Sequence, residues 1–302
     1  MKAWLCGLAL LCGNHAQGGY ENLWPGDAPG APKPPAGTET KDKRGAISDV
    51  EVPQYQVHPA DPARRTGAAV VVFPGGGYRM NVIGKEGHDV AAWLVRQGIT
   101  AIVVKYRVSE HPEMGYGFPV PLLDARRAIR TVRSRAQEWG IDPGKVGVMG
   151  FSAGGHLASL AATRSADTFP QYEGKDAVDA FNVRPDFAIL VYPVISMQEI
   201  AHPGSRERLL GNDTSPEMLA EYSTENSVDV NTPPVFLVTT ADDMVDCRNS
   251  LRFAMACKER NVPVTLHLFE TGGHGYGMPG RGATVGWAEL LREWLRTRGY
   301  VP

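Results

Sequence analysis

The chain has 302 residues, of which 43% are hydrophobic and 21% are charged. This composition is typical of a globular protein with a sizeable core, and it excludes a disordered or collagen-like chain. Lys and Arg together number 31 and Asp and Glu number 33, which gives a formal net charge of -2. Such a balance supplies no basic field for a phosphate backbone, so we expect no nucleic-acid partner.

The first 16 residues have the pattern of a secretory signal peptide. Lys2 precedes an apolar run from Ala3 to Leu11, and small and polar residues follow up to Ala16. The run is too short to span a membrane, and we expect no integral membrane span. The pattern predicts that the protein is secreted or periplasmic. The alternatives are a cytoplasmic chain whose N-terminus happens to be apolar and, as a weaker option, a lipoprotein anchored at Cys12.

Residues 17–46 are predicted to form an extended segment on the surface. The stretch from Leu23 to Pro35 is rich in Pro, Gly and Ala, and the stretch from Glu39 to Arg44 is charged. No core is expected in this segment. Residues 47–302 are interpreted as a single folded domain.

Apolar runs rich in β-forming residues alternate with helical patterns along that domain. The predicted strands cover residues 68–73, 100–106, 145–151, 186–192, 235–240 and 264–269. The predicted helices cover residues 86–97, 121–139, 153–163, 246–260 and 284–296. Several of these strands are apolar on both faces, which is typical of a parallel sheet covered by helices on both sides. The pattern predicts a doubly wound, mostly parallel α/β sheet.

Residues 196–234 interrupt the alternation with polar sequence that contains Pro and Gly. We interpret them as a surface insertion, and we expect no separate cap domain. Cys247 and Cys257 lie ten residues apart in one predicted helix, a separation of about 15 Å at 1.5 Å per residue. This is too far for a disulfide, so both are predicted to be free, buried thiols.

The strongest local motif is Gly150-Phe151-Ser152-Ala153-Gly154, a G-x-S-x-G run. A predicted strand leads directly into Ser152 and a predicted helix follows it, which is the setting of a nucleophile elbow. The glycines are needed because such a turn is strained and tightly packed. The alternative is that Ser152 only caps the helix that follows it.

A serine hydroxyl needs a base and an orienting acid to become a nucleophile. His274 lies in the glycine-rich run 272–277, in the loop after the last predicted strand, and is the candidate base. His156 is expected to pack or cap within the helix after Ser152, and His202 is expected to be a surface polar group.

The acid is expected after the strand at residues 235–240, which gives the chain order Ser, Asp, His. Asp242, Asp243 and Asp246 all qualify by position, but Asp246 is better explained as the cap of the next helix. Successive side chains that leave a strand point to opposite sides, so only one of Asp242 and Asp243 should reach His274.

The run Pro74-Gly75-Gly76-Gly77-Tyr78 follows the strand at residues 68–73. This is the position of the loop that supplies one backbone N–H of an oxyanion hole, and the residue after the nucleophile, Ala153, supplies the other. A dinucleotide-binding loop is excluded because Met80 occupies the third glycine position, and no Walker motif is present. Zinc motifs of the H-E-x-x-H or C-x-x-C kind are absent, so we expect no cofactor and no metal.

The assembled motifs resemble the α/β-hydrolase superfamily, and within it the bacterial carbohydrate esterases of the acetylxylan esterase or feruloyl-esterase-like type. The segments that carry the resemblance are residues 23–30, 74–78, 85–87, 105–107, 150–158 and 272–277. The resemblance implies an α/β-hydrolase fold, with Ser152 as the nucleophile and His274 as the base. It further implies that the amides of Gly76, Gly77 and Ala153 form the oxyanion hole.

The same resemblance favours Asp242 as the acid and leaves Asp243 as the alternative. In the esterases that this chain resembles, the acid stands three residues before a Val that precedes the next helix. Asp242 has this position relative to Val245.

The activity that the resemblance implies is a serine esterase that removes short acyl groups, above all acetyl, from carbohydrates such as xylan or from small esters. Glycines, Ala153 and Tyr78 are expected to surround the acyl group, with Tyr78 contacting the substrate, and no long apolar lid is present. The alternatives are a feruloyl or general short-chain carboxylesterase, a serine peptidase, and a non-catalytic hydrolase fold that binds carbohydrate.

Overall fold

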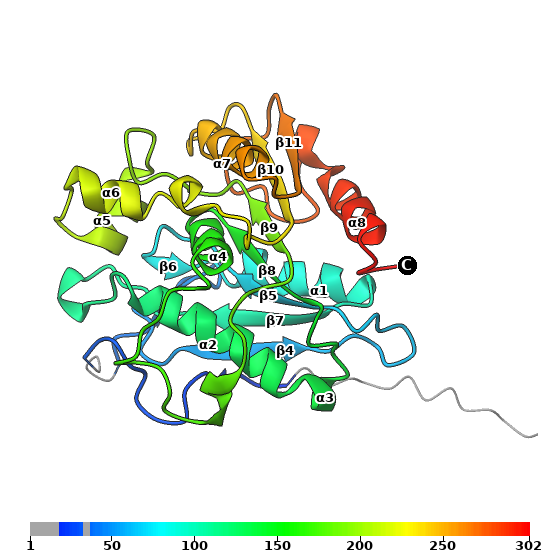
Figure 1. The fold of residues 1–302 in the computed structure, drawn as a ribbon, viewed down its shortest axis with the longest axis horizontal. Coiled ribbons are helices and arrows are strands. Elements are labelled where there is room, and N and C mark those ends of the chain that lie inside the picture. The colour runs from blue at the N-terminus through cyan, green and yellow to red at the C-terminus, as the bar shows by residue number, and fades with distance from the viewer. Residues whose placement is uncertain (1–17, 33–36) are drawn as a thin grey trace, which may run out of the picture.

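The computed structural model describes residues 18–32 and 37–302, so the predicted signal peptide at residues 1–16 lies outside the described residues. The centre of the molecule is an eight-stranded sheet with the strand order β1-β4-β7-β5-β8-β9-β10-β11 (Figure 1). In chain order these strands are β1 (Glu21–Asn22), β4 (Gln54–His58), β5 (Ala69–Phe73), β7 (Thr100–Lys105), β8 (Val146–Phe151), β9 (Ala188–Val191), β10 (Val235–Thr240) and β11 (Val264–Phe269).

The predicted mostly parallel sheet is confirmed. Only β4 pairs antiparallel with its two neighbours, β1 and β7, and the remaining neighbours in the sheet are parallel. The residues of β5, β7, β8, β9 and β10 are buried along their whole length. Their apolar character on both faces therefore reflects burial on both faces of the sheet.

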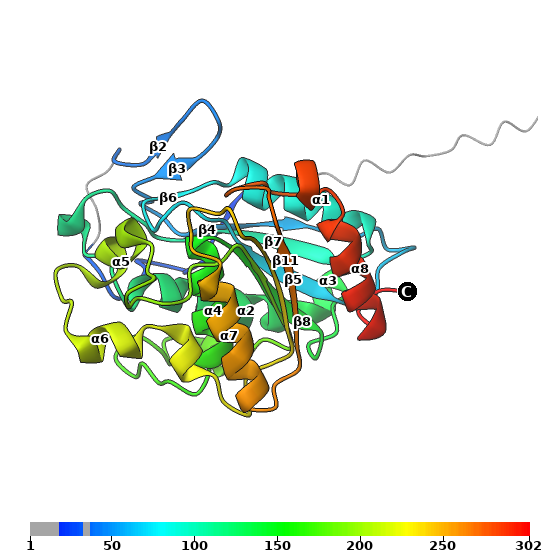
Figure 2. The same cartoon turned by 90° about the horizontal axis from the view of Figure 1, so that it is seen from above.

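Helices cover both faces of this sheet. Figure 2 shows α1 (Asp89–Arg96) and α8 (Trp287–Thr297) on one face, and α2 (Val120–Ser134), α4 (Ala153–Thr163) and α7 (Arg248–Glu259) on the other. Within residues 18–32 and 37–302, no helix is both long and apolar enough to cross a membrane.

Two of the predicted helices contain an irregularity that was not predicted. The helix expected at residues 86–97 starts with a π-helical turn, Gly84–His88, before α1 begins. The helix expected at residues 121–139 is divided into α2 and the short α3 (Ala136–Trp139). Arg135 leaves the helical conformation, with φ -105° and ψ 14°, and the hydroxyl of Ser134 donates to the carbonyl of Thr131 at 2.9 Å. The serine thus provides a local partner for a carbonyl at the helix end.

The helix expected from Asp246 begins two residues later, at Arg248. Asp246 is not its N-cap, because Cys247 occupies that position, but the Asp246 carboxylate still accepts a hydrogen bond from the Arg248 amide at 2.9 Å. Cys247 and Cys257 are both free thiols, as predicted. Cys257 is buried, whereas Cys247 is only half-buried.

Residues 196–234 contain α5 (Pro203–Leu210), α6 (Pro216–Glu221) and a 3₁₀ turn at Thr224–Ser227. Figure 1 shows α5 and α6 beside each other at one end of the molecule. A small three-stranded sheet, β2 (Thr40–Lys41), β3 (Ile47–Ser48) and β6 (Met80–Asn81), was not predicted. In the part of the chain that the structure describes, no separate cap domain is present.

The expectation that residues 17–46 contribute nothing to the core is wrong. Leu23 is 2% exposed and Trp24 is 7% exposed, and both belong to the main hydrophobic cluster. The indole of Trp24 donates to the buried Asp124 at 2.9 Å, and Asp124 also accepts from the Arg107 guanidinium at 2.8 Å and 2.9 Å. The Arg107–Asp124 ion pair therefore provides a polar partner that permits this N-terminal segment to be buried.

Candidate active site

Ser152 lies in the tight turn between β8, which ends at Phe151, and α4, which begins at Ala153. Its backbone has φ 54° and ψ -120°, a left-handed φ that is strained for a residue with a side chain. The Ser152 amide donates to the Val191 carbonyl at 3.0 Å, and the Ser152 carbonyl accepts from the Val194 amide at 3.0 Å. Two hydrogen bonds to the neighbouring β9 segment thus hold the strained turn in place.

The glycines of the G-x-S-x-G motif are required by close backbone approach. A Cβ atom at Gly150 would lie 2.0 Å from the carbonyl oxygen of Gly154, and a Cβ atom at Gly154 would lie 2.2 Å from the carbonyl oxygen of Phe73. Backbone atoms cannot move aside as a flexible side chain can. Any larger residue at either position would therefore push α4 away from the sheet.

Ser152 and His274 are 122 positions apart in the chain, yet their side chains are hydrogen-bonded. The Ser152 Oγ atom lies 2.9 Å from Nε2 of His274. The other ring nitrogen, Nδ1, lies 2.8 Å and 3.0 Å from the two carboxylate oxygens of Asp243. The Asp243 side chain is fully buried, whereas that of His274 is 22% exposed. The three groups form a continuous chain from a buried carboxylate to a serine hydroxyl.

The prediction that Asp242 contacts His274 is wrong, because the structure places Asp243 there. The Asp242 side chain is exposed and accepts hydrogen bonds from the amides of Gly272 at 3.1 Å and Gly273 at 2.8 Å. These amide bonds, that of Gly273 foremost, hold the pKa of Asp242 below its usual range. Asp242 therefore ties down the loop that carries His274, while its neighbour on the opposite side of the chain reaches the imidazole.

The glycine-rich loop after β5 lies directly against Ser152. A Cβ atom at Gly75 would be 2.9 Å from the Cβ atom of Ser152. Gly76 and Gly77 have φ values of 135° and 67°, in the region that favours glycine. Both residues line a cavity of about 520 Å³ together with Ser152 and His274. All three residues predicted to stabilise an oxyanion, Gly76, Gly77 and Ala153, are thus adjacent to the serine in space or in sequence.

Glu86 is a buried carboxylate at this site whose position was not predicted. One of its oxygens accepts from the Gly75 amide at 2.8 Å, and the other accepts from the Tyr192 hydroxyl at 2.8 Å. Burial raises the pKa of Glu86 above its usual range, while the bonds from Tyr192 and Gly75 act in the opposite direction. Glu86 belongs to the Lys-Glu-Gly segment that carries the family resemblance, but periodicity alone gives no reason for its burial.

His202 was expected to be a surface group, and this expectation is wrong in one respect. It lines the same cavity as Ser152, and its Nδ1 atom lies 2.9 Å from the hydroxyl of the buried Ser205. Burial and the nearby His274 hold its pKa below the usual range. The sequence offers no signal for this placement, since His202 sits in the insertion at residues 196–234 and reaches the site only through the path of α5.

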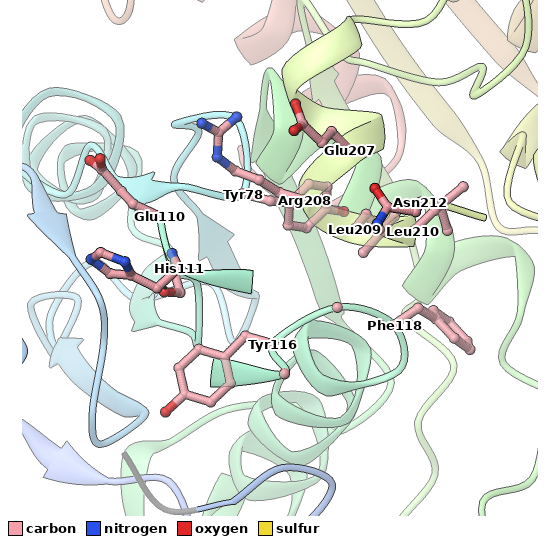
Figure 3. A pocket seen from close by; sticks show the side chains of 14 residues that line it. Tyr78, Glu110, His111, Tyr116, Phe118, Glu207, Arg208, Leu209, Leu210 and Asn212 are labelled. Carbon is pink, nitrogen blue, oxygen red and sulfur yellow. Dashed lines mark hydrogen bonds between the residues drawn. The ribbon is translucent and has the colours of Figure 1, made fainter. Parts of the chain in front are cut away.

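The expectation that Tyr78 faces the acyl group is also wrong. Its side chain is only 2% exposed, and its hydroxyl lies 2.8 Å from Nδ1 of His156. His156 in turn reaches the Tyr222 carbonyl through Nε2 at 2.9 Å, so it packs inside the molecule as predicted. Tyr78 lines a second cavity of about 390 Å³ between the loop at residues 109–118 and the end of α5 (Figure 3).

In the part of the chain that the structure describes, no group of three or more His, Cys, Asp or Glu side chains is arranged to hold a metal ion. The polar side chains around Ser152 are instead engaged with one another or with backbone amides, as described above.

The chain is similar to a known protein family and to several known proteins. The model of the BD-FAE family matches residues 57–256. An acetylxylan esterase of Xylanibacter ruminicola is 36% identical over 222 residues, which cover 72% of this chain and 42% of that protein. An endo-1,4-beta-xylanase B of Butyrivibrio fibrisolvens is 34% identical over 226 residues, which cover 72% of this chain and 34% of that protein. The chain thus spans less than half the length of these two curated relatives.

Solved structures show the same architecture. The acetyl ester-xyloside bifunctional hydrolase of Caldicellulosiruptor lactoaceticus matches with a TM-score of 0.81 and 38% identity, covering 96% of this chain and all of that one. An α/β-hydrolase enzyme from a Medee basin deep-sea metagenome matches with a TM-score of 0.60 and 27% identity, covering 87% and 98% of the two chains. The predicted α/β-hydrolase fold is confirmed, and the chain belongs to the BD-FAE family.

Proposed function

We propose that the protein is a serine carboxylic ester hydrolase that removes acetyl groups from xylan-type carbohydrates. The observation that carries this proposal is the hydrogen-bonded chain from Ser152 through His274 to Asp243, which ends beside a cavity at the strained turn after β8. The names of the relatives support the ester bond and the acetylated carbohydrate as substrate.

Ser152 attacks the ester carbonyl while Nε2 of His274, 2.9 Å from the hydroxyl, accepts its proton. The Asp243 carboxylate accepts a hydrogen bond from the Nδ1–H group of His274, which leaves Nε2 unprotonated to act as the base, and its negative charge stabilises the imidazolium that forms. His274 then returns the proton to the sugar hydroxyl as it leaves. Water repeats the cycle on the acyl-enzyme and releases acetate and free Ser152.

The negative charge on the carbonyl oxygen of the intermediate requires preorganised donors. The amide of Ala153 stands at the first position of α4, where helix amides lack partners within the helix. We assign the remaining donors to Gly76 and Gly77 in the loop that faces Ser152. The Gly75 amide is not available, because it already donates to Glu86.

One set of substrates tests the specificity for the acyl group and for the alcohol that leaves. Purified protein is incubated with acetylated xylan, feruloylated sugars, and aryl esters of acetate, butyrate and octanoate, and the released acid is measured. We expect kcat/KM to fall from acetate to octanoate and acetate to be released from xylan. A profile that peaks at long acyl chains, or ferulate release without acetate release, would contradict the acetyl specificity. Absence of any ester cleavage would contradict the proposal as a whole.

We also propose that the protein is secreted or periplasmic, on the basis of the signal-like pattern at residues 1–16. Expression of the full chain in a bacterial host, followed by N-terminal sequencing of the extracellular or periplasmic fraction, tests this. Recovery of uncleaved chain in the cytoplasm alone would overturn it.

A further inference from the structure

The cavity beside Ser152 has an uneven distribution of charge. Four cationic side chains line it, and the only carboxylate that lines it among the described residues is Glu86. The cationic residues are Arg44, Arg79, Lys85 and Arg208. Glu86 does not offset them at the cavity surface, because it is buried and both of its oxygens are occupied by Gly75 and Tyr192.

Three of these four cations lack an acidic partner. Arg79 pairs with Glu110 at 3.2 Å. The Lys85 ammonium donates to the backbone carbonyl of Gly275, and the Nη1 group of Arg208 donates to the carbonyl of Gly204 at 3.0 Å. Within the described part of the chain, no carboxylate forms an ion pair with Arg44, Lys85 or Arg208. The mouth of the site therefore presents positive charge on a protein whose net charge is -2.

Arg208 stands where the two cavities meet. It lines both the cavity of about 520 Å³ at Ser152 and the neighbouring cavity of about 390 Å³. Among the described residues, the guanidinium of Arg208 donates one hydrogen bond, from Nη1 to the Gly204 carbonyl, so its Nη2 group has no protein acceptor. Figure 3 shows Arg208 and Glu207 extending from α5 on one side of the second cavity, with His111 and Tyr116 on the other side.

We propose that the preferred substrate is an acetylated oligosaccharide that carries a uronic acid, and that Arg208, assisted by Arg44, binds the uronate carboxylate. This inference rests on the proposed function and names the substrate class of the same site. A planar guanidinium matches the geometry of a carboxylate and forms charge-assisted hydrogen bonds with it. With the acetyl group at Ser152, neutral sugar units extend into the second cavity, where polar and aromatic side chains line the wall.

The field of the unpaired cations also steers an anionic substrate toward the site. Arg44 and Lys85 are exposed, so their contribution is screened by salt. A substrate that lacks the carboxylate gains neither the steering nor the charge-assisted bonds. The preference for the anionic substrate should therefore decrease as the ionic strength rises, whereas hydrolysis of the neutral substrate should not.

The test compares two matched substrates. One is an acetylated xylo-oligosaccharide that carries a glucuronic acid side group, and the other is the same molecule after reduction of the carboxyl to an alcohol. At low ionic strength we expect kcat/KM to be higher for the acidic substrate by roughly tenfold, the effect of one charge-assisted contact. In about 0.5 M NaCl the ratio should fall, because the exposed cations are screened, and the direct contact with the half-buried Arg208 should keep it above one.

Three variants separate charge recognition from structural damage. Arg208→Gln should lower kcat/KM more for the acidic substrate than for the reduced one, so that the ratio falls toward one. Arg44→Gln should lower the ratio less, because Arg44 is exposed. Arg292→Gln, an exposed position on α8, should leave the ratio unchanged. A ratio near one in the unmodified protein would overturn the inference, as would equal losses on both substrates in Arg208→Gln and Arg44→Gln. Failure to release acetate from either substrate would instead overturn the proposed function.

Discussion

The carboxylate of Glu86 and the hydroxyl of Tyr192, 106 positions apart in the chain, are hydrogen-bonded at 2.8 Å. The second oxygen of Glu86 accepts from the Gly75 amide at 2.8 Å, and the Tyr192 hydroxyl accepts from the Gly277 amide at 3.2 Å. The pair therefore connects the glycine-rich loop at residues 74–78 to the loop that carries His274. Because both side chains are buried, this link is shielded from water.

Removing the Tyr192 hydroxyl should impair turnover more than binding. Tyr192→Phe keeps the aromatic ring, whose centroid lies 4.8 Å from that of the His274 ring. It deletes the hydrogen bonds of the hydroxyl to Glu86 and Gly277. We expect kcat to fall roughly tenfold, the equivalent of about 1.4 kcal/mol in the barrier, with KM nearly unchanged. Steady-state kinetics on an aryl acetate measures both constants.

Tyr300→Phe is the matched control, because it also deletes a phenolic hydroxyl. This hydroxyl donates to the carbonyl of Asp186 at 3.4 Å, just before the N-terminal end of β9. Tyr300→Phe should leave kcat unchanged. If Tyr192→Phe altered only the melting temperature, or raised KM without lowering kcat, the pair would not position the two loops for turnover.

Ser152→Ala should abolish ester hydrolysis without unfolding the protein. The change deletes one oxygen at a residue that is 9% exposed and removes no core volume. Loss of a serine nucleophile costs on the order of a millionfold in turnover, with residual catalysis from the remaining site. Aryl acetate hydrolysis and a melting curve measure the two effects, with Ser134→Ala at the end of α2 as the control. Activity retained in folded Ser152→Ala protein would remove this residue from the mechanism.

The two neighbouring aspartates should respond differently to the same substitution. Asp243→Asn should lower kcat by roughly 10⁴-fold, because an amide favours the wrong tautomer of His274. Asp242→Asn keeps one oxygen for the Gly272 and Gly273 amides, so we expect a loss of less than about tenfold. The ranking of the two kcat values decides the assignment, and the opposite order would show that Asp242 is the acid.

Acid should destabilise the protein in a window set by its buried histidines. Burial lowers the pKa of His156 from 6.5 to about 4, and burial followed by the charge of His88 lowers that of His58 to about 4. Between about pH 4 and pH 6.5, the two histidines therefore bind protons in the unfolded chain but not in the folded chain. The contribution of these histidines to the free energy of unfolding should therefore be fully present above about pH 6.5. The free energy of unfolding should fall as the pH drops toward 4, by at most about 1.4 kcal/mol per pH unit for each histidine.

Urea unfolding at several pH values measures this slope. His156→Gln should be less stable near neutral pH, because the bonds to Tyr78 and Tyr222 are disturbed, but its acid slope should be smaller by one group. His111→Gln, at an exposed side chain, serves as the control. An unchanged slope in His156→Gln would show that this residue does not take part in the acid destabilisation.

Local sequence determined the main elements of the sheet and the position of the serine. Strands such as β8 and β10 are buried on both faces, so their apolar runs indicate them directly. The G-x-S-x-G run is equally local, because its glycines are required by contacts within a few residues and with the adjacent β5. His274 could be named for a similar reason, since one glycine-rich loop follows the last strand.

The identity of the acid depended on tertiary structure. Asp242 and Asp243 follow the same strand, and which of them faces His274 depends on how the β10 and β11 ends are joined. The Ala241 amide donates to the Phe269 carbonyl at 2.8 Å, and the amides of Gly272 and Gly273 then engage Asp242. No pattern in the sequence specifies these loop hydrogen bonds.

The buried N-terminal segment and the buried Glu86 depended on tertiary structure for a related reason. Trp24 is buried because Asp124 and Arg107 provide polar partners from positions far along the chain, and Glu86 is buried because Tyr192 and Gly75 satisfy its two oxygens. Sequence periodicity reports how apolar a segment is. It does not report whether a distant residue will supply the hydrogen bond that makes burial of a polar group possible.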